Sequence, residues 1–202
     1  WSPETEQEIY SLDELKKAFS VERISKSPAI FDIEKLTWMN GMYIRNLTLE
    51  QFHQLALPHL KNAVKGDFDL VEISKILQPR VSTLNEIDEM VDFFDALPEY
   101  DIAMYTHKKM KTNSEIALAS LKQAREVLAA LPQWSEEAIH DSLMNLIQEL
   151  GIKNGQMLWP VRTAVSGKQF TPGGAIEIAH ILGQAETLRR IDTGIAKLSE
   201  QA

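Results

Sequence analysis

One stretch, residues 158–190, holds the side chains best suited to bind an anionic or planar ligand. It begins with an apolar, helix-compatible run whose single cation is Arg162, and Ser166-Gly167 ends that run because glycine adopts the left-handed cap conformation freely. Thr171-Pro172-Gly173-Gly174 then starts a second helix, since threonine caps helices, proline suits a first turn and glycines permit close approach. A helix N-terminus beside an arginine is typical of an anion-binding site. The alternative is a helical hairpin whose glycines only allow tight packing.

A second arginine, Arg80, follows Pro79 and precedes a predicted helix start. We expect its guanidinium to project from an exposed corner between two helices. Its planar fork can hydrogen-bond a base edge and stack on a ring. The alternative is a surface arginine that pairs with an acidic neighbour, which contributes less than about 1 kcal/mol.

Residues that would support catalysis or metal binding form no recognisable motif. The five histidines are scattered, without HExxH or an i, i+4 pair, and no Gly-rich phosphate loop follows a strand. Acidic pairs such as Glu136-Glu137 occur at helix starts, where the helix dipole favours them. We therefore expect no catalytic residues and no metal ligands in this chain.

The composition restricts the class of protein. Among the 202 residues there is no cysteine, no signal peptide and no apolar run near the ~20 residues of a membrane helix, so we expect a cytoplasmic protein. The formal charge is -8, which disfavours bulk attraction to nucleic acid. Residues 1–150 hold 15 basic and 25 acidic side chains, whereas residues 151–202 hold 6 and 4. Only the last quarter is net positive, and a first residue other than Met suggests a fragment of a longer protein.

Apolar residues at helical spacing and repeated capping signals predict an all-α, multihelical protein with about ten helices. Capping boxes begin at Ser11 and Thr48. Asp32 caps a helix through Arg45, which we expect to place Leu36, Trp38, Met39 and Tyr43 in or near the core.

Later helices are predicted from the same signals. Thr83 caps a helix with Ile87, Val91 and Phe94 on its apolar face. The basic run His107–Lys111 is typical of a solvated helix edge. Long helices follow from Thr112 or Asn113 to Leu131 and from Ser135 to Leu150. We expect two packed helical subdomains, residues 65–132 and 133–202, that meet near residues 130–136. Residues 1–64 form a separate region that contains the first helices.

Two segments together resemble a known family. The first contains Pro160-Val161-Arg162, Ala164, Ser166-Gly167, Thr171-Pro172-Gly173, Leu182-Gly183 and Arg189-Arg190. The second contains Trp1-Ser2-Pro3, Phe19 to Arg23, Ser25 to Ala29, Phe31-Asp32, Glu34 to Leu36, Trp38 to Gly41 and Tyr43 to Arg45. In this order they resemble the end of the stem-contact region and the anticodon-binding region of bacterial glutamyl-tRNA synthetases. The similarity runs nearly from end to end and is densest at residues 1–46 and 155–191.

The segment Arg23–Pro28 (RISKSP) resembles the KMSKS loop of class I synthetases, but we reject that identity. The true loop works beside a nucleotide-binding α/β domain with a HIGH-type motif, and the chain has neither. In the family this segment follows the real loop, so we interpret it as a surface connection.

The resemblance implies roles for individual residues. Arg80 corresponds to an arginine at the first anticodon base, Arg162 to one at the second base, and Thr171 to a residue beside the third. The chain carries an extra residue around Gly173-Gly174, where relatives place a bulky apolar side chain, so Phe170 is a possible substitute for stacking on the third base. Further tRNA contacts are implied for Lys35, Arg45 and Lys168.

The resemblance also implies a function and partners. The chain is expected to bind glutamate tRNA, with glutamine tRNA as a second candidate, and to act as a monomer without DNA or membrane contact. The parent enzyme would use ATP and Mg²⁺ to attach glutamate to its tRNA, in a catalytic domain that lies before Trp1. The fragment itself needs no cofactor. An all-helical protein-interaction module without RNA binding is the alternative.

Overall fold

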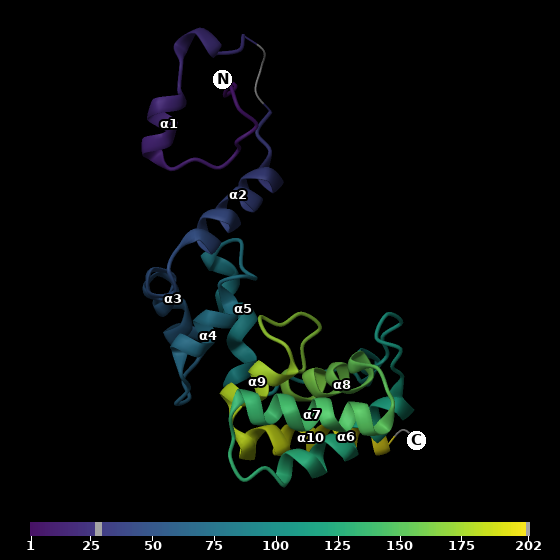
Figure 1. Cartoon of the computed structure of the whole chain (residues 1–202). Coiled ribbons are helices and arrows are strands. Elements are labelled where there is room, and N and C mark those ends of the chain that lie inside the picture. Colours follow the sequence, from purple (N-terminus) through teal and green to yellow (C-terminus); the bar gives the residue numbers. More distant parts are fainter. Residues whose placement is uncertain (27–29, 201–202) are drawn as a thin grey trace.

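A computed structural model describes residues 1–26 and 30–200 (Figure 1). Within these residues the chain forms ten α-helices and four short 3-10 helices, and no strand; one isolated β-bridge joins His107 and Thr112. The all-α prediction is confirmed. The α-helices are α1 (Leu12–Ala18), α2 (Ile33–Asn46), α3 (Leu49–Ala63), α4 (Leu70–Leu77), α5 (Ile87–Val91), α6 (Ser114–Ala129), α7 (Glu136–Leu150), α8 (Asn154–Ser166), α9 (Ala175–Leu182) and α10 (Gln184–Ser199). The 3-10 helices are η1 (Val21–Arg23), η2 (Leu84–Glu86), η3 (Asp92–Phe94) and η4 (Ile102–Tyr105).

Local signals determine most helix ends. The predicted capping boxes form at Ser11 and Thr48, where each side chain accepts a backbone hydrogen bond from the third helical residue. Gly151 and Gly167 end α7 and α8 in the left-handed conformation, with φ of 63° and 61°. A Cβ at Gly167 would also lie 2.9 Å from Cδ1 of Tyr100.

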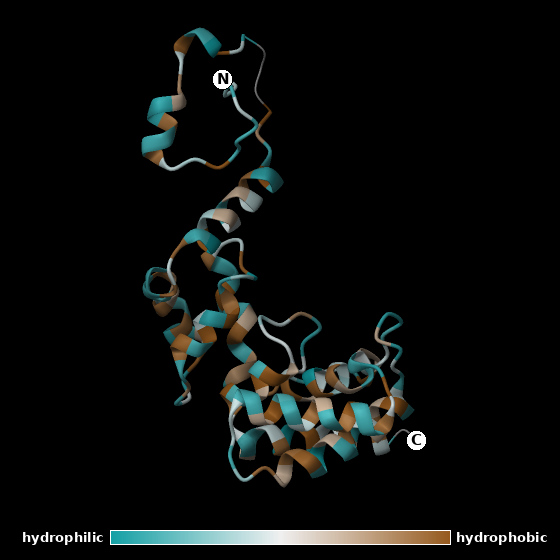
Figure 2. Ribbon diagram, viewed as in Figure 1, coloured by the Kyte–Doolittle hydropathy of each residue, from teal (hydrophilic) through white to brown (hydrophobic). Residues whose placement is uncertain are grey.

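The C-terminal helices form a bundle in which α10 packs on α6 and α8, and α8 packs on α6 and α9. Hydrophobic residues lie mainly on the faces where these helices meet (Figure 2). Gly194 allows the close approach of α10, because a Cβ there would lie 2.5 Å from Oη of Tyr105 and 3.2 Å from Cβ of Ala164.

A second packed group consists of α3, α4 and α5, with Phe52, Leu60, Ile73 and Leu77 in its interior. In Figure 1 this group and α2 form an arm that rises from the bundle at an angle and carries the N-terminal segment at its far end. The loop between α8 and α9, and the turn between η4 and α6, lie on the inner side of this bend.

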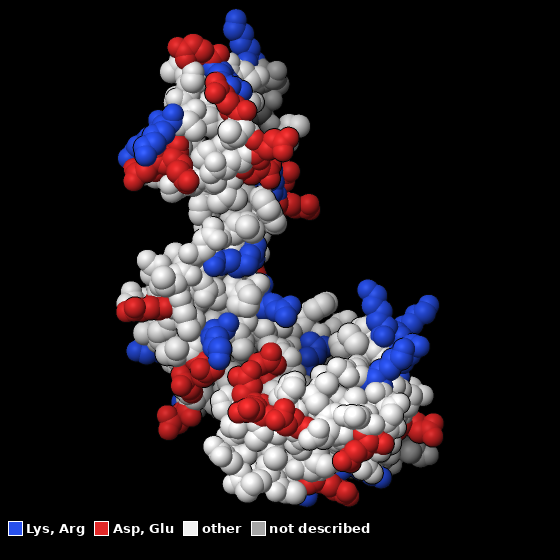
Figure 3. Space-filling view, in the orientation of Figure 1, with Lys and Arg blue, Asp and Glu red and all other residues white. Residues whose placement is uncertain are grey.

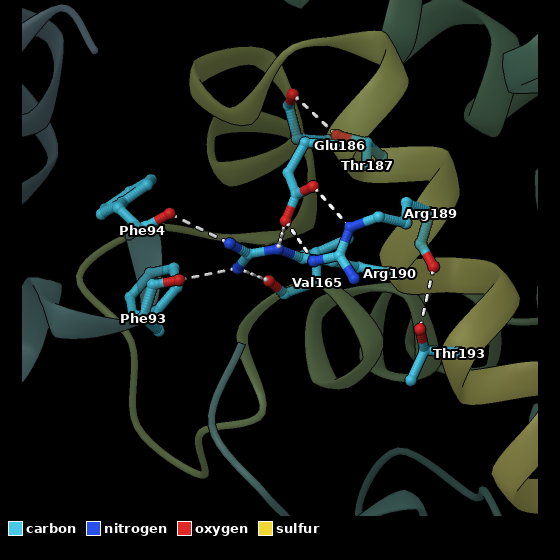
Figure 4. Close-up of polar contacts among 9 residues, drawn as sticks. Phe93, Phe94, Val165, Glu186, Thr187, Arg189, Arg190 and Thr193 are labelled. Atoms are coloured by element: carbon cyan, nitrogen blue, oxygen red, sulfur yellow. Dashed lines mark hydrogen bonds and ion pairs between the residues drawn. The ribbon is translucent and has the colours of Figure 1, made fainter. Parts of the chain in front are cut away.

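A fully buried arginine joins the bundle to η3, the 3-10 helix that directly follows α5 of the arm (Figure 4). Arg190 donates through Nη1 to the carbonyl oxygens of Phe93 and Val165, both at 2.7 Å, and through Nη2 to that of Phe94 at 3.0 Å. Its Nε donates to Glu186 at 2.6 Å. These acceptors satisfy the buried guanidinium, and they belong to η3, α8 and α10.

Several sequence predictions are wrong in detail. Leu36, Trp38 and Tyr43 of α2 are exposed and Met39 is only partly buried, because just the lower end of α2, at Gly41 and Ile44, reaches the packed body. Gly41 closes on the loop after α4, where a Cβ would lie 2.9 Å from Oγ of Ser82.

Two later predictions are also corrected. Thr83 makes no capping hydrogen bond, since its hydroxyl donates to Glu86 at 2.7 Å and the chain continues as η2. The run His107–Lys111 is a turn rather than a helix edge, because residues 107 and 112 pair with each other. Ser27 and Pro28, the end of the predicted surface connection, lie outside the described residues, as does Ala29.

The subdomain limits stay a prediction. Helix α6, which the prediction assigns to residues 65–132, packs on α7, α8 and α10.

In the part of the chain that the structure describes, no helix combines the length and apolarity needed to cross a membrane.

Candidate nucleic-acid interface

Arg80 and Arg162, far apart in the sequence, line the same groove. Its volume is about 440 Å³, within the usual range for ligand sites. Thr171, Gly173 and Gly174 also line it, so five of the predicted anticodon-binding residues come together. The remaining lining residues are Met110, Asn154, Gly155, Leu158, Trp159 and Ala175.

Arg162 is held at the groove by α8 and by the loop that follows it. Its Nη1 donates to Oγ1 of Thr171 and its Nη2 to the carbonyl oxygen of Gln169, both at 2.9 Å. Partial burial lowers the pKa of its guanidinium. No carboxylate pairs with it among the described residues. The site therefore has a positive charge that only neutral oxygens solvate.

Two aromatic rings, inclined at 50° to each other, lie beside this guanidinium. Cζ of Arg162 lies 4.3 Å from the ring centroid of Trp159, and the ring of His107 lies 4.1 Å from the ring of Trp159. The indole Nε1 donates to the carbonyl oxygen of Met104 at 2.8 Å, which fixes the plane of the ring. Cation–π contacts of this kind contribute about 0.5–2 kcal/mol.

The loop between α8 and α9 differs from its prediction. Thr171 and Pro172 do not start α9, which begins at Ala175 with Gly174 as its N-cap. The hydroxyl of Thr171 instead accepts from Arg162 and donates to the carbonyl oxygen of Gly173 at 2.7 Å, so it is not available as a cap. A Cβ at Gly173 would lie 3.2 Å from Cδ1 of Ile76, which shows that this glycine also allows the loop to pack on α4.

Arg80 lies in the turn after α4, where its backbone N–H donates to the carbonyl oxygen of Leu77 at 2.8 Å. Its side chain is exposed and forms no hydrogen bond or ion pair with any described residue. The alternative prediction, that Arg80 pairs with an acidic neighbour, is therefore wrong. Arg80 also lines a smaller pocket of about 230 Å³, together with Glu72, Glu136 and Glu177.

The other predicted residues lie outside this groove. Phe170 is 81% exposed on the same loop. Lys168 pairs with Asp92 at 2.8 Å and thereby links the loop to η3. Lys35 pairs with Glu8 at 2.7 Å, and this hydrogen bond raises the pKa of the lysine. Arg45 is exposed, with its guanidinium beside Gly41.

Trp159 and Met110 line the groove, and His107 contacts the ring of Trp159; none of the three was predicted as a site residue. The spacing of Trp159 and Arg162 could have indicated their contact, because i and i+3 side chains share one face of a helix. The contact with His107 has no such signal, since it joins segments distant in the sequence.

Basic and acidic side chains both occur on this face of the molecule, and the basic ones are concentrated in two places. Figure 3 shows Lys and Arg side chains along the inner side of the bend and at the loop end of the bundle, with acidic side chains beside them. No group of three or more His, Cys, Asp or Glu that could hold a metal ion occurs in residues 1–26 or 30–200. The arrangement is suited to bind an anionic polymer with planar groups, at the groove rather than over the whole surface.

Known proteins are similar to this chain in sequence and in fold. Residues 51–195 match the family described as "Anticodon binding domain". The glutamate–tRNA ligase of Clostridium tetani is 57% identical over 201 residues, and that of Clostridium botulinum strain Loch Maree is 56% identical over 198 residues. These matches cover 100% and 98% of this chain but 41% of each relative, so the chain spans about two fifths of their length.

Solved structures give the same result. A glutamate–tRNA ligase from Elizabethkingia meningosepticum, in complex with its amino acid, is 26% identical with a TM-score of 0.79. The match covers 98% of this chain and 39% of that one. A second, from Elizabethkingia anophelis, is 25% identical with a TM-score of 0.78 and covers 97% and 38%.

Proposed function

The chain belongs to the anticodon binding domain family, and we propose that it is the tRNA-binding part of a glutamate–tRNA ligase and recognises the anticodon loop of glutamate tRNA. One observation carries the proposal: Arg80 and Arg162 line one groove, and neither has a carboxylate partner among the described residues. Single-stranded RNA loops are recognised by such groups, because their bases are splayed out, stacked on flat side chains and hydrogen-bonded at their edges.

We assign the anticodon bases to named groups. Arg80 binds the first base, Arg162 the second, and Thr171 with Gly173-Gly174 accommodates the third. Trp159 holds the Arg162 guanidinium in its plane. Phe170 is exposed on the same loop and available for stacking. By analogy with base readout in DNA, each bidentate contact contributes roughly 1–3 kcal/mol of discrimination.

The parent enzyme would activate glutamate with ATP and Mg²⁺ and transfer it to the 3′ end of the tRNA. These groups would be bound by the part of the parent outside this chain. Here no Gly-rich phosphate loop follows a strand, and the described residues hold no group of metal ligands. The contribution of this chain would be positional, since binding of the anticodon orients the distant acceptor end.

Filter binding tests the proposal. We expect this chain to bind a glutamate tRNA transcript more tightly than transcripts with a changed first or second anticodon base. Arg80→Ala and Arg162→Ala should each weaken binding about 5- to 150-fold and abolish the preference at its own base. Arg162→Lys keeps the charge but loses the planar fork, so it should lose the preference while keeping more affinity.

Arg125→Ala is the matched control, because Arg125 is an exposed arginine on α6 that pairs with Asp192 of α10. It should bind like the unchanged chain. If the anticodon variants bind equally well, or if Arg80→Ala and Arg162→Ala behave like the control, the assignment of the groove is wrong. Comparison with glutamine tRNA shows whether Arg80 selects between the two.

A protein-interaction module is the second candidate, and apolar side chains exposed between residues 12 and 43 favour it. Leu12, Val21, Phe31 and Trp38 are examples, each at least 44% exposed. Salt distinguishes the two functions. Binding to RNA should weaken steeply between 50 and 200 mM salt, whereas an apolar protein contact responds little.

A further inference from the structure

The turn between η4 and α6 carries three lysines that the groove does not include: Lys108, Lys109 and Lys111, all exposed. The turn is built by backbone hydrogen bonds between His107 and Thr112, at 3.1 and 3.3 Å, and by one from Lys111 to the carbonyl oxygen of Lys108 at 3.3 Å. The backbone N–H of Met110 donates to Nδ1 of His107 at 3.3 Å. The three ammonium groups are therefore presented from a defined turn.

These lysines have no acidic partner among the described residues. Elsewhere Lys16, Lys35, Lys75, Lys168 and Lys197 each form an ion pair. In a chain with a net charge of -8, three unpaired cations within four residues form a local positive field. Figure 3 shows basic side chains, without acidic ones among them, at the end of the bundle where Figure 1 draws this turn.

The turn is also attached directly to the groove. Met110 lines the groove and lies against Gly155, where a Cβ would be 2.8 Å from its Sδ. The ring of His107 lies against the ring of Trp159 at an interplanar angle of 50°, and the Trp159 ring also contacts Arg162. The lysines are thus held at the rim of the site that we assign to the bases.

We propose that Lys108, Lys109 and Lys111 bind the backbone phosphates of the RNA strand whose bases enter the groove. This inference rests on the proposed function of the groove. Phosphate contacts supply affinity that depends on salt but not on sequence, whereas base contacts supply the preference for sequence. The two tasks are divided between the turn and the groove.

The test is a triple variant, Lys108→Gln, Lys109→Gln and Lys111→Asn. Asparagine suits position 111 because Lys111 has a left-handed backbone with φ of 57°, which asparagine tolerates. We expect binding of glutamate tRNA at 0.15 M salt to weaken roughly tenfold or more, and the slope of log K against log salt to fall by about 2. The ratio between the cognate and the changed anticodons should stay the same.

The control is the triple variant Lys61→Gln, Lys65→Gln and Lys122→Gln, which removes the same amount of charge. These three lysines are exposed and lie in α3, in the loop after α3 and in α6, respectively. It should keep the original slope. A turn variant with unchanged affinity and slope, or no weaker than the control, overturns the inference. If the unchanged chain shows no anticodon preference, the proposed function itself fails, so the two failures are distinguishable. Circular dichroism of both variants verifies that the helices are intact.

Discussion

The guanidinium of Arg162 has hydrogen-bond partners within the protein, yet its charge remains available to attract an anionic ligand. Two neutral oxygens and the face of Trp159 compensate for its partial burial, but none of them neutralises its charge. A carboxylate partner would stabilise the free protein and compete with an anionic ligand. Its absence among the described residues leaves the electrostatic attraction for a ligand.

Glu186 gives a prediction about pH at the residue scale. Hydrogen bonds from Arg189 and then Arg190 lower its pKa from 4.5 to about 2. A carboxyl with a lowered pKa stabilises the fold above its unfolded value, and this contribution is lost as the pH falls towards 2. Glu186→Gln should therefore reduce the free energy of unfolding on the order of 2 kcal/mol at pH 7, a value discounted because Arg189 is 59% exposed.

Urea denaturation of both proteins from pH 7 to pH 3 measures this effect. The difference between them should be constant above pH 5 and shrink below about pH 4.5. A difference that does not change with pH would show that the carboxylate charge of Glu186 is not what stabilises the fold.

Adjacent arginines on α10 allow a matched test at the scale of elements. Arg190 is fully buried and bonded to three carbonyl oxygens, whereas Arg189 is exposed and bonded only to Glu186. Arg190→Met leaves buried carbonyl oxygens without a donor, so we expect a loss on the order of 3 kcal/mol or more. Arg189→Met should cost less than about 1 kcal/mol.

Urea denaturation with both variants checks the contrast. Arg190→Met should also weaken RNA binding when the arm and the bundle no longer hold Arg80 and Arg162 at one groove. Equal stability of the two variants would mean that the buried guanidinium does not join the elements.

The elements were predictable where their signals are local. Capping boxes at Ser11 and Thr48 and the stop at Gly167 involve neighbours within four residues, and they form as expected. The start at Thr171 is wrong because its hydroxyl is bonded to Arg162 across the loop. The burial of Arg190 was not predictable, since three of its four hydrogen bonds go to backbone carbonyl oxygens, which any sequence provides.

The groove was predictable only in part. The resemblance identified Arg80, Arg162 and the Thr171–Gly174 loop, and the structure brings these together. Helical spacing predicted a buried face for α2, but periodicity does not reveal whether another element is present to cover that face.

At the scale of the whole molecule, stability is distributed unevenly. Helix α1 has seven residues and none is buried, whereas α6 and α10 bury five residues each. Short helices without tertiary packing are marginal in water. We expect amide hydrogens of α1 to exchange at least about tenfold faster than those in the middle of α6 and α10. Hydrogen exchange followed by NMR measures this, and equal protection would contradict the uneven distribution.

Helix α2 makes the position of the N-terminal segment depend on the contacts at its C-terminal end. A helix of 14 residues is about 21 Å long, and only the C-terminal end of this one reaches the body. There Asn40 donates to the carbonyl oxygen of Ser82 at 2.6 Å, and Gln78 donates to the carbonyl oxygen of Ile44 at 3.0 Å. By simple leverage, a tilt of about 10° at that end moves the far end by about 4 Å. A methyl group added at position 41 would lie 2.9 Å from Oγ of Ser82 and 3.1 Å from Nη1 of Arg45, so these side chains or α2 itself must shift to admit it. Any tilt of α2 that results is transmitted, enlarged, to the N-terminal segment.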